Sequence, residues 1–261
     1  MKKYLQFLKY AFKEQRQYRT NFFASIATML FNDACFMIIF IIFLAYFTGT
    51  WLTMWNFLVL IGVSCMAYGF THWVFYNIWG LCDIIERWKL DYYLSFPTKP
   101  LWFLTCTKVG ISDLWDILFG LICLCIYAFV FADGSARIVI LKWLAVFAIA
   151  SVAVIGIYIA LWSVSFWLQK WSKVADLFNS MFLSFSQYPP EIYKESKTIH
   201  ILMCILLFPW VLLPYKMMMG TSTIWQWLLL IGLATVIFVA WILVFRIWLK
   251  RYSSGNLVHQ M

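Results

Sequence analysis

The sequence predicts an all-α membrane protein, and three observations lead to this prediction. Of the 261 residues, 64% are hydrophobic and 12% are charged, whereas soluble domains are about half apolar and a quarter charged. The apolar residues form long continuous runs of the length that crosses a hydrocarbon core, roughly 20 residues. No ten-residue alternation of the kind seen in membrane β-strands is visible. Since backbone groups in lipid must be hydrogen-bonded internally, we expect these runs to be helices.

The first element expected is an amphipathic helix over 1–20. One helical face carries Tyr4, Leu5, Leu8, Ala11 and Phe12, and the other carries Gln6, Lys9, Lys13 and Arg16. Such a helix lies flat at a membrane surface, with its basic face on anionic lipid headgroups. The segment lacks a short apolar core ending in a small-residue cleavage site, so it is not expected to be a signal peptide.

Seven apolar runs follow, at 22–47, 55–80, 111–131, 138–168, 174–187, 199–219 and 224–249. Basic residues gather at both ends of the chain, so an even number of crossings is expected. The run 199–219 contains Pro209 and Pro214, which interrupt helical hydrogen bonding, and polar segments flank it. We therefore expect six membrane helices and a re-entrant hairpin at 199–219, between the fifth and sixth helices on the outer side.

The distribution of basic residues predicts the orientation. With six crossings, the inner segments collect the basic residues of both ends together with Arg87, Lys89, Lys99, Lys108, Lys170 and Lys173. The outer segments keep Arg137, Lys142, Lys194, Lys197 and Lys216. An excess of Lys and Arg marks the cytoplasmic side, so both ends are expected to be cytoplasmic. No internal repeat is visible, and 1–261 is expected to form one transmembrane domain.

The segment 82–97 is the first inner loop and resembles a short amphipathic helix. Ile84, Ile85, Trp88 and Tyr92 share one helical face. On another face, Arg87 has a carboxylate four residues away on either side, Asp83 and Asp91. Two interpretations stay open for this segment: a helix that docks a partner, or a solvated connector whose apolar face rests on the membrane.

Several short motifs follow one another along the chain. The loop motif comprises Ile85, Leu90, Asp91, Tyr92 or Tyr93, Leu94 and Pro97. Further along come Phe185-Ser186-Gln187-Tyr188-Pro189, Ile192-Tyr193, Phe208-Pro209, Pro214 and Arg251-Tyr252-Ser253-Ser254. In their order, from the first loop to the end of the chain, these motifs resemble those of the ABC-2-type permeases of bacteria and archaea. In this family a glycine often precedes the Leu-Asp pair, where this chain has Trp88-Lys89.

The resemblance implies a permease subunit of an ATP-driven exporter in a bacterial or archaeal cytoplasmic membrane. Its fold would have an interfacial helix, six membrane helices, a coupling helix in the first cytoplasmic loop and the re-entrant hairpin. Such permeases work as pairs, of the same or homologous chains, each seated on a separate ATPase. The chain has no GxxxxGK[ST] phosphate loop, so ATP and Mg²⁺ are expected on the partner ATPase and not on this chain. The residues expected to contact or orient against that ATPase are Asp83, Glu86, Arg87, Lys89 and Asp91, with Trp88 and Tyr92 as apolar anchors.

Ionisable residues inside membrane segments are costly and mark candidate functional positions. Asp33, beside Asn32, is the deepest, and it is expected either to line a transport path or to bond a neighbouring helix. His72 is expected to be a hydrogen-bonded helix-interface residue, with titration near neutral pH as the alternative. Asp113 and Asp116, near the cytoplasmic end of the third run, are expected to be interfacial residues or ion-pair partners. The cysteines show no CxxC pair, so no metal, cofactor or catalytic site is expected.

Three other classes of function remain open. An ion-coupled secondary transporter would have broken helices in paired halves and an ion site at the membrane midplane. An intramembrane enzyme would need a clustered motif such as HExxH. A purely structural partner of another permease is the third. The net charge of +9 follows membrane topology, so lipid headgroups explain it and no nucleic-acid partner is expected. The apolar, aromatic bundle favours export of lipids, hydrophobic drugs or peptides.

Overall fold

The computed structural model describes residues 19–46, 54–97, 99–110, 112–130, 136–168, 170–188, 208–220 and 223–250, with 6, 9, 10, 13, 14, 17, 197, 198, 201 and 252. The secondary structure of these residues is entirely helical. Its long helices are α2 (Arg19–Tyr46), α3 (Met54–Trp79), α7 (Leu114–Val130), α8 (Ala136–Ser163), α9 (Ser172–Ser186) and α12 (Ile224–Leu249). Its short ones are α4 (Leu81–Glu86), α5 (Leu90–Leu94), α6 (Pro100–Cys106), the 3₁₀ turn η1 (Val164–Phe166), the π-helical turn η3 (Phe208–Leu212) and α11 (Leu213–Met219).

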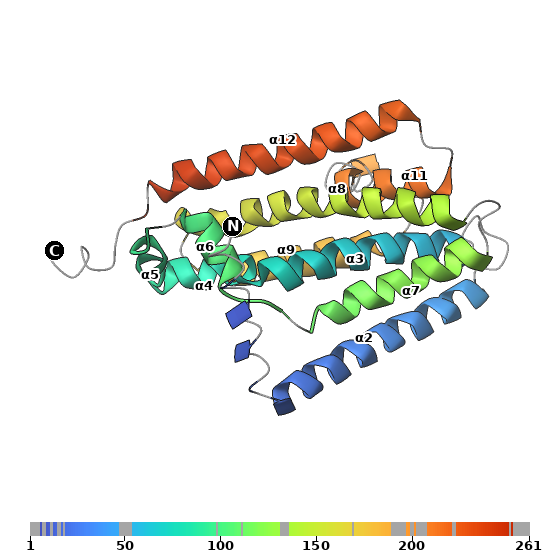
Figure 1. The fold of residues 1–261 in the computed structure, drawn as a ribbon, viewed down its shortest axis with the longest axis horizontal. Helices are drawn as coiled ribbons and strands as arrows, with labels where there is room; N and C mark the ends of the chain where they lie inside the picture. The colour runs from blue at the N-terminus through green and yellow to red at the C-terminus, as the bar shows by residue number, and fades with distance from the viewer. Residues whose placement is uncertain are drawn as a thin grey trace.

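The long helices run lengthwise beside one another, and α4, α5 and α6 gather at one end of the bundle (Figure 1). The bounds of the six long helices lie within a few residues of the six apolar runs expected to cross the membrane. By length and apolar composition, three helices in the described residues are able to span a bilayer: Asn56–Glu86, Arg137–Phe166 and Ile224–Leu249. Phe23–Ile39 and Leu114–Val130 are shorter apolar helices. Six crossings therefore stay a prediction.

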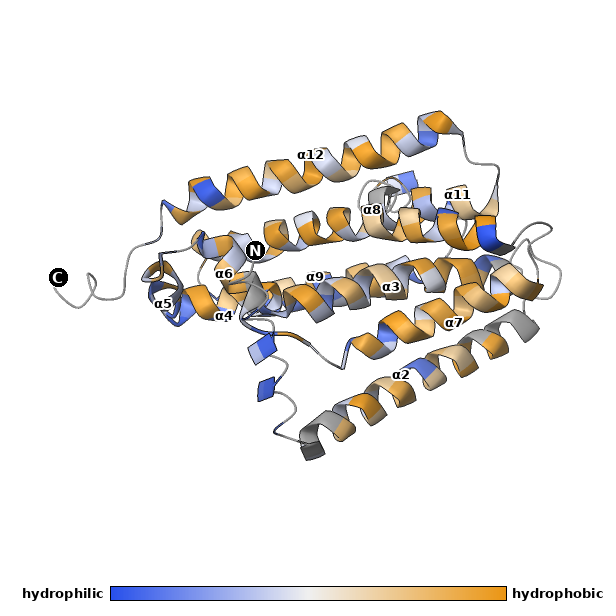
Figure 2. Cartoon of the chain, in the orientation of Figure 1, coloured by the Kyte–Doolittle hydropathy of each residue, from blue (hydrophilic) through white to orange (hydrophobic). Residues whose placement is uncertain are grey.

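Hydrophobic residues make up most of the long helices, including the outermost helices α2 and α12 (Figure 2). Large exposed side chains stand on α2, α7 and α12, among them Phe31 at 73%, Phe129 at 72% and Val236 at 65% exposure. An apolar surface of this extent is unfavourable for a monomer in water, but it is suited to contact with lipid tails. The chain is a multi-pass membrane protein.

Helix α3 is the centre of the bundle, and it approaches α7 closely at small residues. A Cβ atom on Gly120 of α7 would come within 2.8 Å of the Gly62 carbonyl oxygen and 2.6 Å of Met66 Cγ, both on α3. The missing side chains let the two backbones touch, which is how helices associate in membranes without a hydrophobic driving force. On the other side of α3, helix α8 packs against both α3 and α12.

The end of the bundle opposite α4–α6 is held by polar contacts. Lys142 Nζ, near the start of α8, donates to the Gly220 carbonyl oxygen just after α11, at 2.9 Å. Helix α12 then begins with a capping box: Thr223 Oγ1 accepts from the Gln226 backbone N–H, and Gln226 Oε1 accepts from the Thr223 N–H. These contacts satisfy backbone groups that the helix ends would otherwise leave unpaired.

Some expected elements differ in the structure. The predicted helix over 82–97 is two helices, α4 and α5, with a turn between them, and the additional short helix α6 follows. Of the expected re-entrant segment 199–219, the structure describes residue 201 and the pair η3–α11, which packs against α3 and α8. Pro209 lies in η3 and Pro214 is buried in α11. Most of the expected interfacial helix over 1–20 lies outside the described residues.

Candidate functional site

The segment Leu81 to Pro97, called the α4–α5 loop below, has one buried and one exposed side. Leu81, Ile84, Ile85 and Leu90 are buried in the main core. Full burial of such a side chain stabilises a fold by about 1.5–3 kcal/mol, so the loop is anchored firmly to the bundle. The exposed side carries Asp83, Arg87, Trp88, Lys89 and Tyr92. Of the expected partner-binding residues, only Glu86 and Asp91 are half-buried.

The turn between α4 and α5 depends on an unusual backbone at Trp88. Its φ angle is +58°, in the left-handed region that costs residues with a Cβ roughly 1–2 kcal/mol. The Lys89 backbone N–H donates to the Ile84 carbonyl oxygen at 2.9 Å, which closes the turn. The helix therefore stops at Glu86 and restarts at Leu90. A glycine at position 88 would adopt this conformation without strain.

The turn leaves Trp88 beside Tyr252, which comes just after α12. Their ring centroids are 6.1 Å apart, and the Tyr252 ring also lies 6.4 Å from Phe166. Burial raises the pKa of Tyr252 to about 12, and the negative charge of Asp91 acts in the same direction. Tyr252, the described residue of the Arg-Tyr-Ser-Ser motif, thus packs against Trp88 of the loop, although more than 150 residues separate the two in the sequence.

Glu86 faces inward and binds the start of α9. Its Oε1 accepts a hydrogen bond from the Ser172 backbone N–H at 3.2 Å. An acidic side chain at a helix N-terminus satisfies an unpaired N–H and complements the helix dipole. The neighbouring Asp83 and Arg87 form an exposed ion pair, with 3.7 Å between Oδ2 and the guanidinium. Glu86 therefore positions α9, while Asp83 and Arg87 stay at the surface.

Asn77, which the sequence analysis did not single out, joins α3 to α5 and α6. It is 3% exposed. Its Nδ2 lies 2.6 Å from Thr107 Oγ1, 2.8 Å from the Leu104 carbonyl oxygen and 3.2 Å from Tyr93 Oη. A buried amide with such partners fixes the loop relative to the long helices. Polar character within an apolar run is the signal that marks Asn77 in the sequence.

A second group of polar residues surrounds a cavity between α2, α3, α7 and α9, called the acidic cavity below. Its lining comprises Met29, Asn32, Asp33, Ser64, Cys65, Tyr68, Asp116, Leu183, Ser186 and Gln187. It offers about 190 Å³ to water-sized molecules. The expected pathway or interface residues Asn32 and Asp33 thus lie at this cavity. Asp116, expected near the membrane interface, also lines it and is 8% exposed.

His72 lies on the same side of α3, one turn beyond Tyr68. Its Nδ1 is 3.6 Å from Asp113 Oδ2, and Asp113 is also buried. The His72 ring packs on Tyr68 and Trp79, with centroid distances of 4.4 Å and 3.6 Å. Asp113, expected to be an interfacial residue or an ion-pair partner, is a buried partner of His72. Because 41 residues separate His72 from Asp113 in the sequence, the pair can be recognised only once α3 and α7 are packed together.

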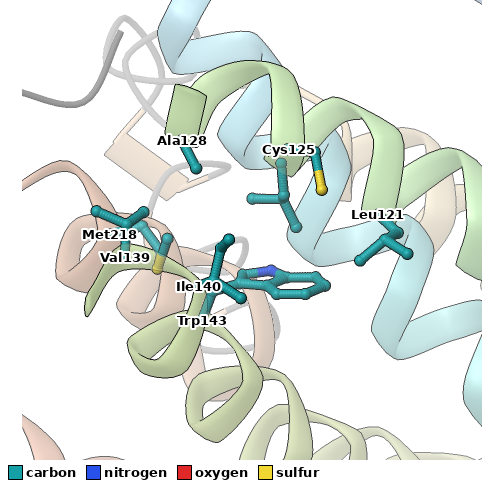
Figure 3. Close-up of a pocket in the computed structure, with 8 residues that line it drawn as sticks. Leu121, Cys125, Ala128, Val139, Ile140, Trp143 and Met218 are labelled. Atoms are coloured by element: carbon teal, nitrogen blue, oxygen red, sulfur yellow. The ribbon is translucent and has the colours of Figure 1, made fainter. Parts of the chain in front are cut away.

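A different, apolar cavity lies between α7, α8 and α11 (Figure 3). Leu121, Leu124, Cys125, Ala128, Val139, Ile140, Trp143 and Met218 line it. It offers about 20 Å³, roughly the room of one water molecule. With no charged side chain in its lining, it is a packing defect that supplies no chemistry. Among the described residues, no group of three or more His, Cys, Asp or Glu side chains could hold a metal ion.

Comparison with known proteins identifies a family. The model of the family described as "ABC-2 family transporter protein" matches residues 33–255. This range covers well over half of the chain, from Asp33 in α2 to beyond Tyr252. No curated protein matches the chain, and no solved structure does.

Proposed function

Because the chain belongs to the ABC-2 family of transporter proteins, we propose that it is a permease subunit that couples ATP hydrolysis by a separate ATPase to export across a cytoplasmic membrane. Membership in this family implies association with an ATP-binding-cassette ATPase. The chain itself would carry no catalytic site, and ATP and Mg²⁺ would bind the ATPase. A second permease, of the same or a homologous chain, would complete the membrane pathway.

The proposed topology has six crossings, formed by α2, α3, α7, α8, α9 and α12, with both ends of the chain in the cytoplasm. The distribution of charge along the bundle supports it. The end that carries α4–α6 holds Arg87, Lys89, Lys99, Lys108, Lys170, Lys173, Arg246 and Lys250, whereas the other end holds Arg137, Lys142 and Lys216. The positive-inside rule assigns the first end to the cytoplasm. In this topology η3 and α11 form the re-entrant hairpin on the outer side.

The observation that carries the proposal is the α4–α5 loop at that cytoplasmic end. Its apolar side is fixed in the core, yet Trp88 is 41% and Tyr92 60% exposed. Aromatic residues are enriched at the centre of protein interfaces, and polar or charged residues form the rim around them. In the proposed complex, Trp88 and Tyr92 fill a groove of the ATPase. Asp83, Arg87, Lys89 and Asp91 then orient the loop within it.

Movement of the ATPase would reach the membrane helices through two rigid connections. Glu86 ties the loop to the start of α9, and Asn77 ties α3 to α5 and α6. Both α3 and α9 line the acidic cavity. A loop that moves as a rigid body therefore has direct contact with the helices whose rearrangement would change access to the membrane interior. We propose lipids, hydrophobic drugs or peptides as the exported class.

Affinity purification with a matched control tests the proposal. The native chain, a Trp88→Ala/Tyr92→Ala variant and a Phe129→Ala/Trp225→Ala variant would be tagged in the native host, purified in mild detergent and analysed by mass spectrometry. Both variants remove two exposed aromatic residues, but Phe129 and Trp225 belong to the opposite end of the bundle. We expect an ATP-binding subunit with the native chain and the control, and a loss of at least about tenfold with the loop variant. Absence of an ATPase from all three preparations would refute the proposal.

A further inference from the structure

The acidic cavity contains two carboxylates whose charges no described side chain balances. Asp116 is 8% exposed, and in the described part of the chain its carboxylate has no hydrogen-bond or ion-pair partner. Asp33 Oδ2 is buried and also has no hydrogen-bond partner there, although Asn32 and Trp115 lie beside the carboxylate. The hydroxyls of Ser64 and Ser186 donate to carbonyl oxygens of their own helices. The cavity therefore keeps unused acceptor capacity.

Two carboxylates around one cavity in a membrane protein repel each other and are poorly solvated. Within the described residues, no Lys or Arg side chain lies within ion-pair distance of Asp33 or Asp116. Asp113 precedes Asp116 by three residues, and His72 is paired with Asp113, so His72 does not serve as a partner of Asp116. A bound cation would relieve this repulsion and satisfy the free oxygens. The charge of the site thus selects a positively charged ligand.

The size and lining of the cavity favour an organic cation over a bare metal ion. The cavity offers about 190 Å³ to water-sized molecules, well above the roughly 10–15 Å³ that a single water needs. A desolvated metal ion would need a tight shell of oxygen ligands, which a space of this size does not form. Tyr68 also lines the cavity, and an aromatic ring near an ammonium group adds a cation–π attraction. Met29 and Leu183 add apolar surface for an attached hydrocarbon chain.

We propose that the acidic cavity binds the ammonium group of an amphiphilic organic cation, with Asp33 and Asp116 as its charge partners. Its hydrocarbon part would lie along Met29 and Leu183. That such a cation is also the transported substrate rests on the proposed export function; the binding itself does not. The proposal thus narrows the substrate class to amphiphiles that carry a basic nitrogen.

The test uses the purified full-length chain in phosphatidylcholine nanodiscs and isothermal titration calorimetry, with empty nanodiscs as the blank. Octylammonium is the probe, and octanol is its neutral control with the same hydrocarbon chain. Asp33→Asn and Asp116→Asn each remove one charge, and Asp176→Asn removes an exposed carboxylate of α9 outside the cavity. Thermal unfolding followed by tryptophan fluorescence verifies that each variant is folded. Should Asp116→Asn fail to fold, Asp33→Asn carries the test, because Asp33 is less buried.

We expect saturable binding of octylammonium to the native chain and to Asp176→Asn, weakened at least about tenfold in Asp33→Asn and Asp116→Asn, since an ionic hydrogen bond contributes that much. Equal binding of octanol would overturn the proposal, as would binding that neither cavity variant weakens. Saturable binding of sodium with none of octylammonium would overturn it in favour of an ion site. A chain that retains its ATPase but binds no octylammonium refutes only the cavity proposal; one that binds octylammonium but no ATPase refutes only the exporter assignment.

Discussion

The Glu86 side chain accepts a hydrogen bond from the backbone N–H of Ser172, which lies 86 positions further along the chain. Ser172 is the first residue of α9, and the last turn of the same helix contributes Leu183 and Ser186 to the acidic cavity. One rigid helix therefore connects the α4–α5 loop with the cavity. Through this contact Glu86 positions α9. Its role therefore differs from that of its exposed neighbours Asp83 and Arg87.

Replacing Glu86 should weaken coupling without removing the ATPase. Glu86→Ala removes the charged carboxylate that accepts the hydrogen bond from Ser172. A hydrogen bond to a charged group contributes about 1.5–3 kcal/mol. We expect a lower thermal unfolding midpoint and an undiminished amount of ATPase in the purified complex, but less transport per ATP hydrolysed. Glu86→Gln keeps an acceptor oxygen and should lie close to the native chain in all three measurements. If Glu86→Ala loses the ATPase as fully as Trp88→Ala/Tyr92→Ala does, Glu86 is a contact residue instead.

The backbone conformation at Trp88 predicts that a glycine variant is more stable there than an alanine variant, the reverse of the usual order in a helix. Both variants remove the ring beside Tyr252, but only glycine adopts a φ of +58° without strain. Trp88→Gly should therefore be more stable to unfolding than Trp88→Ala by about 1 kcal/mol. At Lys89, where φ is −74°, the order should reverse, because alanine is favoured in a helical conformation. Denaturant unfolding of the four variants measures both differences, and the same order at the two positions would contradict the assigned turn.

The sequence predicts the long helices well because their signal is local. Each apolar run in lipid has one favourable secondary structure, so composition alone indicates a helix and its approximate ends. The break at Trp88 is harder, because tryptophan is not a residue that marks a left-handed turn. Ile84, Ile85 and Trp88 share a helical face in the sequence, but the turn sends Trp88 outward while both isoleucines stay buried. Only the packing of the loop against the bundle decides this.

Removing the Asn77 amide should loosen the loop from the long helices. Asn77→Ala removes the buried amide that donates to the Leu104 carbonyl and the Thr107 hydroxyl, at a cost of about 1–3 kcal/mol, and leaves the carbonyl only its bond from the Thr107 hydroxyl. We expect a lower free energy of unfolding and faster proteolysis between α5 and α6. The matched control is Ser184→Ala, since Ser184 is exposed and bonds only within its own helix. A loss of stability equal in both variants would show that the Asn77 contacts contribute nothing specific.

A double-mutant cycle isolates one of these contacts. Tyr93 Oη lies 3.2 Å from Asn77 Nδ2, so Tyr93→Phe should destabilise the native chain but have a smaller effect once Asn77 is alanine. The difference measures the coupling between the two side chains, expected at about 0.5–1.5 kcal/mol. Equilibrium unfolding of the native chain, both single variants and the double variant gives the four free energies. Strict additivity would mean that Tyr93 and Asn77 act independently.

The candidate site depends on pairs that no local pattern reveals. Asp33, Asp116 and Asp113 belong to two parts of the chain separated by more than 60 residues, and in the sequence Asp113 and Asp116 resemble interfacial carboxylates after Lys108. They are buried because α3 and α7 approach closely enough to bring them against Tyr68 and His72. Gly69 of α3 permits this proximity, because a Cβ there would come within 2.8 Å of Asp116 Cβ, and Gly62 and Gly120 permit the same close approach further along the two helices.

That close approach leaves no room for a side chain at Gly120 of α7. A Cβ there would meet the Gly62 carbonyl oxygen at 2.8 Å, so Gly120→Ala must push α3 and α7 apart at a cost of about 1–3 kcal/mol. Gly232 of α12 has open space within 4 Å of the position that a Cβ would take, and Gly232→Ala should gain up to about 1 kcal/mol from helix propensity. Unfolding measurements on both variants compare the same added methyl group in two surroundings.

Because displacement of α7 also moves Asp116, Gly120→Ala should in addition weaken octylammonium binding, whereas Gly232→Ala should leave it unchanged. Equal stability of the two variants would mean that α3 and α7 are not in backbone contact.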